Sequence, residues 1–380
     1  MAGAGSRRDA LMGDKSTIEW TRGDDGSLGA TWNPIRGCSR VSEGCRNCYA
    51  ERTAIRQAHP EIPEEPPSIG VVRRAGAYAG LVRSTPDGPR WTGEVRFIEE
   101  ALPLPLRWRA PRRVFVNSMS DLFHEKVADV WIDQIFAVMA LGGSHRRYFG
   151  VSGHTFQVLT KRPEQLRMYM DDPDTPKRIA WKIEEIAADD RSMRSTRGRW
   201  PDEVANAVRR RDVWPLECVW LGVSVEDPPT AKERWSYLRD TPAAVRWISY
   251  EPGLAGVDFI EAEILPRRRY APAIEKANGV YADWIVCGGE SGPGARPFDL
   301  AWARATIAQG RAARVPVFVK QLGSVPIGTA LYQGESWPAH VRVEPHDGDG
   351  CPALVRLRLR DRKGGDPSEW PEDIRVRELP

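Results

Sequence analysis

Three cysteines stand close together in the segment of residues 32–51, and they make up half of the chain's six cysteines. They are Cys38, Cys45 and Cys48. The segment is rich in Gly, Ser and Asn and has no apolar periodicity that would bury three thiols in a core. A short loop can direct its sulfurs at one point, and Gly37 and Gly44 let the backbone turn beside the ligands. We therefore predict a metal or iron–sulfur centre here.

The number of thiols distinguishes between kinds of centre. A structural zinc site takes four protein ligands, whereas an iron–sulfur cluster held by three cysteines leaves one iron open for chemistry. The main alternative is a Cys₃His zinc site with His59 as the fourth ligand, since His59 stands at the predicted end of a helix that begins at Cys48. A disulfide is the other alternative, and an intracellular chain disfavours it.

Composition limits the class of protein. The 380 residues suffice for one large α/β barrel with additions or for two ordinary domains, and 41% hydrophobic with 28% charged residues is typical of a soluble globular chain. A net charge of +3 is too small to establish a nucleic-acid partner. Residues 1–14 predict a disordered tail without a signal peptide, and apolar runs are too short to span a membrane. We interpret the protein as cytoplasmic.

The elements around the cysteines follow a regular order. A strand is expected at residues 16–21, a helix at 48–59 and a linker at 61–67. From Gly93 onward, short β-branched runs alternate with helical patterns. The predicted strands are residues 95–98, 114–116, 156–159, 219–223, 245–249, 284–287 and 315–319. The predicted helices are residues 130–141, 163–170, 228–238 and 300–313.

Alternating strands and helices favour a parallel sheet. Their number predicts a whole or partial (βα)₈ barrel over residues 15–325, with a doubly wound open sheet as the alternative. Residues 171–215 form a charged helical insertion, which is either a solvated excursion or a nucleic-acid contact. Residues 326–380 form a C-terminal extension that we expect to pack on the barrel, with a strand near Val355–Arg360.

Polar residues follow most of the predicted strands, at the edge where a parallel barrel has its active site. They are Ser118, Ser120, Asp121, Lys161, Arg162, Glu226, Asp227, Glu251, Gly288, Gly289, Glu290, Ser291, Lys320 and Gln321. Asp121, Asp227 and Ser291 each also stand where a helix cap is expected. Lys161, Lys320 and Gln321 are poor caps, so the whole set predicts a polar site.

Two further features bear on the site. Gly288–Arg296 is a glycine-rich loop whose backbone could approach a ribose, a phosphate or an amino-acid group, although it is neither a Walker motif nor G-x-G-x-x-G. Cys218 and Cys287 stand in or beside apolar strands, which predicts small buried side chains rather than ligands. Cys351 lies in a Gly/Asp loop and indicates nothing.

Seven stretches of the chain resemble the phage three-cysteine-motif proteins, a family of bacteriophages and prophages. They are the cysteine segment Thr31–Glu51, Val114–His124, Leu159–Pro163, Val219–Glu226, Tyr250–Pro252, Gly288–Arg296 and Phe318–Gln321. That family is distantly similar to the radical S-adenosylmethionine (SAM) superfamily, with spore photoproduct lyase among its nearer analogues. The resemblance implies a partial barrel with a [4Fe–4S] cluster on three cysteines and SAM on the fourth iron.

The resemblance also implies roles for residues. Cys38, Cys45 and Cys48 would hold the cluster; Ser118, Ser120, Asp121, Glu226 and the Gly288–Ser291 loop would hold SAM. Lys161, Arg162, Glu251, Lys320 and Gln321 would face the substrate. Reductive cleavage of SAM would give a 5′-deoxyadenosyl radical, with electrons from a partner protein.

The expected substrate is DNA or a nucleotide, for modification or repair. The phage resemblance and the basic, Trp-containing segments at residues 107–113 and 197–200 favour it. The competing hypothesis is a zinc-stabilised nucleic-acid-binding or host-interaction protein without catalysis.

Overall fold

The computed structural model describes residues 15–23, 25–58, 76–189, 200–266, 280–329, 342–345 and 354–380. The predicted tail, the linker at residues 61–67, His59, residues 191–199 and Cys351 lie outside these ranges. The chain divides into two units. The first comprises residues 1–41, 48–158 and 168–219, and the second comprises residues 42–47, 159–167 and 220–380. Cys38 and Cys48 belong to the first unit and Cys45 to the second.

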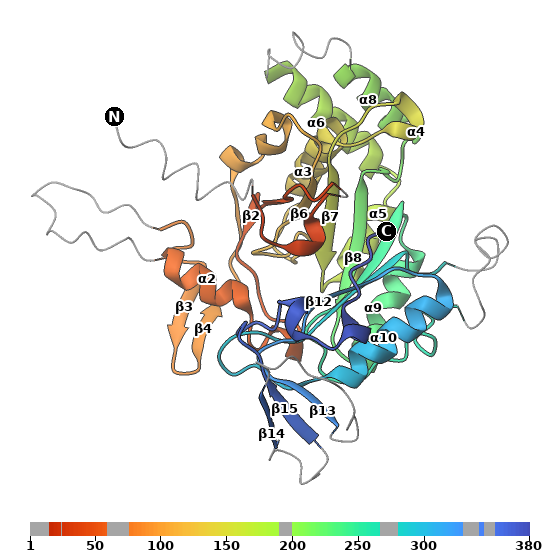
Figure 1. Ribbon diagram of the computed structural model, residues 1–380. Coiled ribbons are helices and arrows are strands. Elements are labelled where there is room, and N and C mark those ends of the chain that lie inside the picture. Colours follow the sequence, from red (N-terminus) through yellow and green to blue (C-terminus); the bar gives the residue numbers. More distant parts are fainter. Residues whose placement is uncertain are drawn as a thin grey trace, which may run out of the picture. The chain divides into compact units, whose positions relative to one another are not determined.

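The fold is mixed α/β, as predicted, with a parallel sheet of seven strands in the order β1-β6-β7-β8-β9-β10-β12 (Figure 1). The strands are β1 (Ala30–Trp32), β6 (Arg113–Val116), β7 (Thr155–Thr160), β8 (Val219–Val225), β9 (Val245–Tyr250), β10 (Trp284–Gly288) and β12 (Val317–Gln321). Six of them confirm predicted strands. Their central residues are buried, which explains why continuous apolar runs marked them in the sequence.

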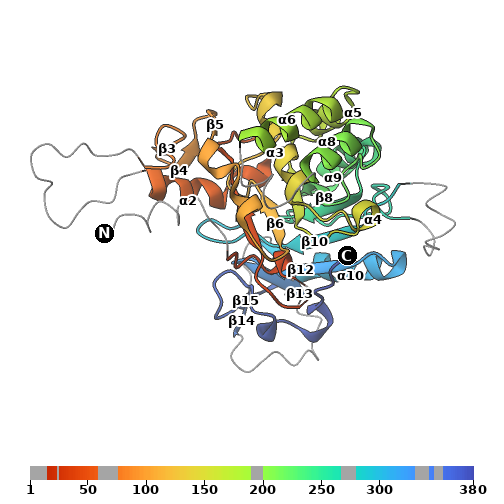
Figure 2. The same cartoon turned by 90° about the horizontal axis from the view of Figure 1, so that it is seen from above.

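Helices connect these strands. They are α2 (Tyr49–Ala58), α3 (Asp129–Gly142), α4 (Arg146–Phe149), α5 (Pro163–Asp171), α6 (Thr175–Asp189), α8 (Trp200–Arg209), α9 (Pro228–Asp240) and α10 (Leu300–Ala313). All predicted helices are present to within a few residues. Helices α6 and α8 confirm that the insertion is helical, and they lie side by side in both views (Figure 1, Figure 2).

The first unit contains a small layer beside the cysteines. Helix α2 packs on the hairpin of β3 (Val82–Thr85) and β4 (Gly88–Trp91), around Tyr78 and Trp91. Cys38, Cys48 and Met119 pack against this cluster. The first turn of α2 and the two cysteines of the first unit therefore share one apolar support.

In the second unit, α10 packs on β10 and β12. Asp227 caps α9 through a capping box with Thr230, and Asp299 caps α10. Trp247 and Trp284 are fully buried in the core. A second sheet has the order β11-β13-β15-β14, formed by β11 (Phe298–Asp299), β13 (Pro326–Thr329), β15 (Leu354–Arg358) and β14 (Arg342–Pro345).

The last residues of the chain pack within the second unit. The Arg377 guanidinium lies 5.4 Å from the ring centre of Phe318 on β12 and 5.1 Å from that of Trp370. The indole nitrogen of Trp284 donates to the carbonyl of Glu378 at 3.0 Å. Two 3₁₀ turns, Pro367–Glu369 and Glu372–Ile374, flank Trp370. The polar C-terminal sequence thus contacts β12 through the Arg377 side chain and β10 through the Glu378 carbonyl.

Two predictions differ from the structure: the strand at residues 16–21 is absent, and the strand at residues 95–98 is present but lies outside the parallel sheet. Residues 16–21 contain a 3₁₀ turn at Glu19–Thr21 instead of a strand, because Ser16 and Thr21 hydrogen-bond to the backbone of Ile18 and compete with strand pairing. Residues 95–98 contain β5 (Arg96–Phe97), which pairs antiparallel with β2 (Ile35–Arg36) outside the parallel sheet. The first strand of that sheet is the three-residue β1, too short to give a pattern. Two further 3₁₀ turns are Glu99–Ala101 and Leu104–Arg107.

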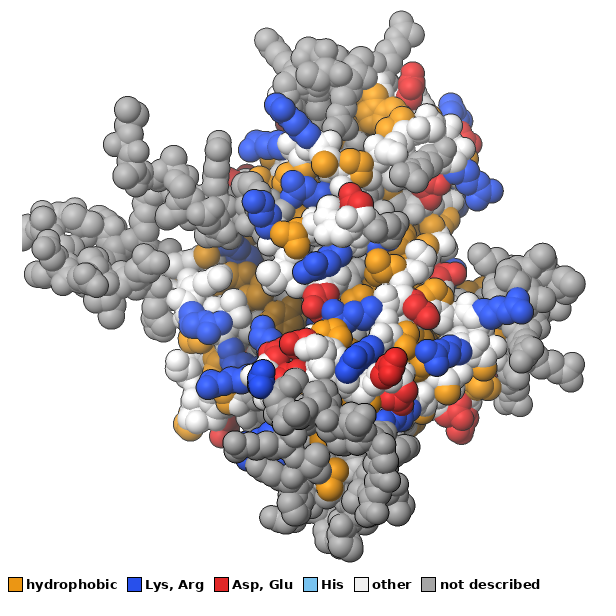
Figure 3. Space-filling model, in the orientation of Figure 1, with side chains coloured by type: hydrophobic (Ala, Val, Ile, Leu, Met, Phe, Trp, Pro, Cys, Tyr) orange, Lys and Arg blue, Asp and Glu red, His pale blue; other side chains and the backbone are white. Residues whose placement is uncertain are grey.

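The described surface carries charge of both signs. On the face drawn in Figure 3, Lys and Arg side chains lie among Asp and Glu side chains rather than in one continuous basic patch. Among the described helices, none is both long and apolar enough to cross a membrane.

Candidate functional site

The cysteine loop begins at a tight connection between β2 and the end of β6. Gly37 has φ +92°, and a Cβ there would lie 2.1 Å from the carbonyl oxygen of Glu94, so only glycine fits. The Asn117 side chain accepts from the backbone of Ile35 at 3.3 Å, and Asn117 itself takes the left-handed conformation at φ 56°. The start of the loop is therefore fixed by the strand end that precedes Ser118.

Three residues predicted to hold SAM have local partners in the first unit. Ser118 donates to the Asn33 side chain at 3.2 Å, and Ser120 donates to the carbonyl of Ile35 at 2.8 Å. The Asp121 carboxylate accepts from the backbone of Phe123 at 3.0 Å within a turn and not at the start of a helix, so it is not the helix cap that was its alternative. The Ser118 and Ser120 side chains join the end of β6 to the segment that leads into the cysteines.

Glu51 holds the next part of the loop. Its carboxylate, almost completely buried, accepts two hydrogen bonds from the Arg40 guanidinium and one, at 3.0 Å, from the backbone of Trp91. Such a bidentate pair is among the stronger polar contacts in proteins. The sequence prediction missed this residue; its signal was an acidic residue in the first turn of α2, which alone indicates only a favourable helix dipole.

His124 is buried beside Ser39, next to Cys38. Its Nδ1 accepts from the backbone N–H of Lys126 at 3.1 Å, so in the neutral ring the proton is on Nε2, which lies 3.0 Å from the Ser39 hydroxyl. Ser39 then donates to the Glu125 carboxylate at 3.1 Å. His124 thus donates toward Ser39 and does not act as a base on it.

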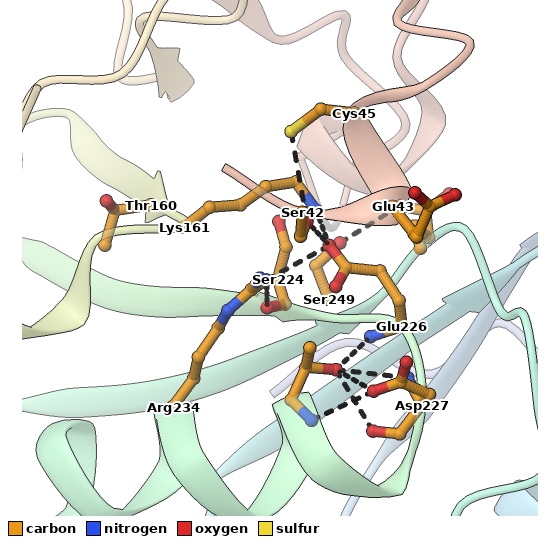
Figure 4. A network of polar contacts seen from close by, with 12 residues as sticks. Ser42, Glu43, Cys45, Thr160, Lys161, Ser224, Glu226, Asp227, Arg234 and Ser249 are labelled. Atoms are coloured by element: carbon orange, nitrogen blue, oxygen red, sulfur yellow. Dashed lines mark hydrogen bonds and ion pairs between the residues drawn. The ribbon is translucent and has the colours of Figure 1, made fainter. Parts of the chain in front are cut away.

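The second unit holds the middle of the loop, residues 42–47, which we call the Cys45 segment. It contains a 3₁₀ turn, Glu43–Cys45, in which Cys45 N–H donates to the carbonyl of Ser42 at 2.9 Å. The Ser42 hydroxyl donates to the Glu226 carboxylate at 3.0 Å and lies 3.9 Å from the sulfur of Cys45 (Figure 4).

Glu226, at the end of β8, is the centre of a charged cluster. Its side chain is 1% exposed and meets the Lys161 ammonium and, at 3.0 Å, the Arg234 guanidinium (Figure 4). Arg234 also donates to the carbonyl of Ser224 at 2.6 Å, which fixes its position on α9. Burial alone would raise the pKa of Glu226, but the charges and hydrogen bonds of Lys161 and Arg234 outweigh burial and lower it. We call Glu226, Lys161, Arg234 and Ser42 the Glu226 cluster.

Glu290, after β10, holds the other end of the Cys45 segment. Its carboxylate accepts from the Asn47 side chain at 2.9 Å and from the backbone and guanidinium of Arg296 at 2.8–3.1 Å. Asn47 also donates to the carbonyl of Gly294 at 2.7 Å, and Arg296 donates to that of Glu43 at 2.9 Å. Burial opposes ionisation, yet these donors lower the pKa of Glu290.

Two other strand ends of the second unit meet each other. The Lys320 ammonium lies 2.9 Å from the Glu251 carboxylate, which also accepts from Ser249 at 3.3 Å. The Gln321 side chain donates to the carbonyl of Gly289 at 2.8 Å. A Cβ at Gly289 would lie 2.4 Å from the carbonyl oxygen of Leu322, so here the glycine allows close strand packing.

The second unit therefore brings together most of the predicted residues. Glu226, Lys161 and Cys45 lie in one group, Glu290 and the Gly288–Ser291 loop adjoin it through the Cys45 segment, and Glu251 pairs with Lys320. Four partners were not predicted, because nothing local marks them. They are Ser42, Asn47, Arg234 and Arg296.

The five described cysteines are thiols and fall into two classes. Cys218 and Cys287 are buried, as predicted, and burial raises the pKa of both well above that of an ordinary thiol. Cys38, Cys45 and Cys48 are partly exposed. Within the described residues, no three His, Cys, Asp or Glu side chains are already gathered as a metal site. The loop cysteines nevertheless fit a thiolate-bound centre in kind, since they are accessible and adjacent in sequence.

Residues 15–344 match the model of a family described as a protein of unknown function, DUF5131. The chain belongs to this family. No curated protein and no solved structure is similar enough to the chain to match it.

The DUF5131 match includes all three loop cysteines, the Glu226 cluster, Glu290 and the Glu251–Lys320 pair. It ends within β14, so the contact that Arg377 makes with Phe318 on β12 comes from a residue beyond the DUF5131 match.

Proposed function

We propose that the chain is a radical SAM-type iron–sulfur enzyme in which Cys38, Cys45 and Cys48 hold a [4Fe–4S] cluster. The observation that carries the proposal is the difference between the cysteines. Three adjacent thiols are partly exposed on a loop that buried carboxylates hold in place, while Cys218 and Cys287 are buried. Ordering a loop around accessible thiols is unfavourable unless a ligand binds those thiols. A cluster bound by the three cysteines would explain why the loop is ordered.

The fold supports the proposal at a coarser level. Seven parallel strands with connecting helices agree with a partial (βα)₈ barrel, and we propose that the sheet has this architecture. The polar residues discussed above follow β6, β7, β8, β9, β10 and β12 at their C-terminal ends. Ligand sites of parallel α/β folds lie at those ends.

A cluster with SAM supplies one-electron chemistry that ends in a 5′-deoxyadenosyl radical. The chain's own residues would bind and orient. Ser118, Ser120, Asp121 and the backbone of Gly288–Ser291 are the proposed SAM contacts. Lys161, Glu251, Lys320 and Gln321 would face the substrate, with the Glu251–Lys320 pair offering both charges at one strand end. The carboxylates of Glu226 and Glu290, which were expected to hold SAM, take another role argued below.

The proposed substrate is DNA or a nucleotide, and an electron donor is the proposed protein partner. One described feature favours a base as the target. Arg112 lies over the indole ring of Trp108 at 5.3 Å, in the basic segment of residues 107–113. Aromatic and guanidinium planes of this kind stack on nucleobases.

The test is anaerobic preparation of the full chain with iron, sulfide and metal analysis. The expected result is a brown, oxygen-sensitive protein with about four iron and four sulfide per chain, as for one [4Fe–4S] cluster. SAM should change the EPR spectrum of the reduced form, and 5′-deoxyadenosine should appear. A colourless protein with one zinc per chain would overturn the proposal.

The alternative zinc site requires His59 as a fourth ligand, and His59 lies outside the described residues. If the cluster proposal holds, Cys45→Ala should lose the metal and His59→Ala should keep it. Equal loss of metal in both variants would favour a zinc-stabilised binding protein.

A further inference from the structure

We propose that Glu226 and Glu290 are positioning residues that hold Cys45 in place for metal binding, and that their carboxylates do not bind the cofactor. The inference rests on the proposed function in one respect only, since Cys45 is taken as a ligand.

The first argument is that both ends of the Cys45 segment are held, each by one carboxylate. Ser42, three residues before Cys45, donates to Glu226 at 3.0 Å. Asn47, two residues after Cys45, donates to Glu290 at 2.9 Å. The only regular structure between them is a single 3₁₀ turn, which is too short to be stable alone. The position of the Cys45 sulfur therefore depends on tertiary contacts, among which these two hold side chains on either side of the turn.

The second argument concerns shape. A Cβ added at Gly44 would lie 2.4 Å from the Glu226 carboxylate oxygen and 2.5 Å from its Cγ. The segment thus lies directly against the Glu226 side chain, and glycine at this position permits the approach. A polar contact at Ser42 and a steric contact at Gly44 thus place the Cys45 segment against the same side chain, that of Glu226.

The third argument counts the acceptor sites of Glu290. A carboxylate has about four lone-pair positions. Glu290 accepts from the Asn47 side chain, the Arg296 backbone, and two guanidinium nitrogens of Arg296. Three of these donors reach Oε2 and one reaches Oε1, so the chain's own donors occupy most of the carboxylate and leave a SAM amino or hydroxyl group at most one position, on Oε1.

The Glu226 carboxylate also accepts from the chain's own donors, but these come from separate elements. One of its oxygens accepts from Ser42, Lys161 and Arg234, which come from the cysteine loop, the end of β7 and helix α9. Removing such a carboxylate would leave Arg234 buried without its charge partner. The Glu226 side chain thus links the end of β7, the end of β8 and helix α9 to the Cys45 segment.

The experiment measures Cys45 itself, in the full-length, metal-free, reduced protein. Alkylation by iodoacetamide is followed by mass spectrometry at each loop cysteine, with Cys38 and Cys48 as internal references. Ser42→Ala and Asn47→Ala should each raise the Cys45 rate about fivefold, the effect of one lost hydrogen bond on an opening equilibrium. Glu226→Gln and Gly44→Ala should raise it further. The rates of Cys38 and Cys48 should stay within about twofold of the parent, because the first unit holds those residues through Glu51.

Matched variants separate positioning from general loosening. Ser42→Thr keeps the hydroxyl and should restore the parent rate. Glu369→Gln alters an equally buried glutamate of the same unit that accepts from the backbone of Arg360 and Asp361, and Cys45 should not respond. Gly328→Ala adds a methyl at ordinary contact, 3.8 Å from Leu300, and serves the same purpose for Gly44→Ala. Equal acceleration at all three loop cysteines, or in the control variants, would overturn the proposal.

A metal probe adds a spectroscopic readout. Co²⁺ added to the metal-free protein gives a sulfur-to-cobalt absorption band whose intensity increases with the number of thiolate ligands. Ser42→Ala and Asn47→Ala should lower this intensity by about a third if one of three thiolates is lost. Unchanged intensity would overturn the proposal even where alkylation changes.

The two proposals fail separately. If the parent chain binds neither iron nor cobalt, the proposed function fails, while alkylation still decides whether Glu226 and Glu290 order Cys45. If the parent binds a cluster and Cys45 reacts identically in all variants, only the positioning role is wrong.

Discussion

Two buried carboxylates, Glu226 in the second unit and Asp133 in the first, each meet an arginine, yet their pKa values move in opposite directions. Asp133, on α3, accepts from the Tyr169 hydroxyl at 2.8 Å and from Arg178 at 3.0 Å. Burial raises the pKa of Asp133 more than these two partners lower it. The pKa of Glu226 is lowered although its side chain is even less exposed.

The partners explain the difference. Glu226 has two cations, and one of them, Arg234, is itself buried and fixed by a backbone carbonyl. Asp133 has one cation, Arg178, whose side chain is 31% exposed and shared with Asp172. Two cations, one of them buried, offset the burial of one carboxylate, while one cation that is about a third exposed does not. The comparison teaches that Glu226 is maintained as an anion next to the cysteine loop, whereas Asp133 is a helix-packing contact that tolerates neutralisation.

The largest effect on the free energy of unfolding is expected when Glu226 loses its charge. Glu226→Gln should lower the free energy of unfolding by about 3 kcal/mol, because it leaves Arg234 buried without a charge partner. Asp133→Asn, of the same chemistry and similar burial, should change it by less than about 1 kcal/mol, because burial already opposes the charge there. Urea unfolding of both variants measures the difference.

A double variant controls this result. Glu226→Met with Arg234→Met removes the buried pair together, and Lys161, still partly exposed, can reach water along its own stem. Stability should return to within about 1 kcal/mol of the parent, since apolar replacements of buried pairs are often neutral. Comparable losses for Glu226→Gln and Asp133→Asn would contradict the proposed difference between the clusters.

The sequence allowed part of this arrangement to be predicted. The strands β6, β7, β8, β9 and β10 are marked by apolar runs because buried parallel strands lack polar faces, and the residues that follow them were therefore placed correctly. Strand β1 was missed because three residues are too few to give a pattern, and the turn at Glu19–Thr21 was missed because local side-chain hydrogen bonds determine it.

The contacts of the site could not be predicted in the same way. Ser42 and Glu226 are 184 residues apart, and Asn47 and Glu290 are 243 residues apart. Neither serine nor asparagine in a polar loop differs locally from a solvated one. Which carboxylates hold the Cys45 segment follows only from the tertiary fold, whereas the sequence predicts Glu226 and Glu290 as cofactor-binding residues from their positions after strands.

A smaller effect is expected in how the stability contributed by Glu226 and by Asp133 depends on pH. The lowered pKa of Glu226 means that its ionised form adds stability above the ordinary value of 4.5, and this stability is lost as the pH falls through the folded-state pKa. The raised pKa of Asp133 has the opposite sign: its contribution is complete below the ordinary value of 3.8 and is lost as the pH rises through the folded-state pKa.

The difference in unfolding free energy between the parent and Glu226→Gln should therefore shrink on acidification. The unfolding free energy of Asp133→Asn should increase relative to that of the parent as the pH rises. Urea unfolding at several values between about pH 3 and pH 6 measures both trends. Parallel pH profiles for the two variants would show that the number of cations does not decide the sign.

The smallest loss of unfolding free energy is expected at the Glu251–Lys320 pair, because this ion pair is partly exposed to water. The Lys320 side chain is 29% exposed and that of Glu251 is 14% exposed, so water screens the pair and either group can be solvated when the other is removed. Glu251→Gln should lower the unfolding free energy by less than about 1 kcal/mol, and the loss should decrease further at high salt. The measurement is urea unfolding at low and high salt, with Glu226→Gln alongside as the buried reference, whose loss should depend little on salt. If Glu251→Gln costs as much as Glu226→Gln, burial and the number of cations are not what distinguish the strand-end carboxylates. A loss confined to substrate turnover would instead place Glu251 and Lys320 at the reaction site, where the proposed function expects them.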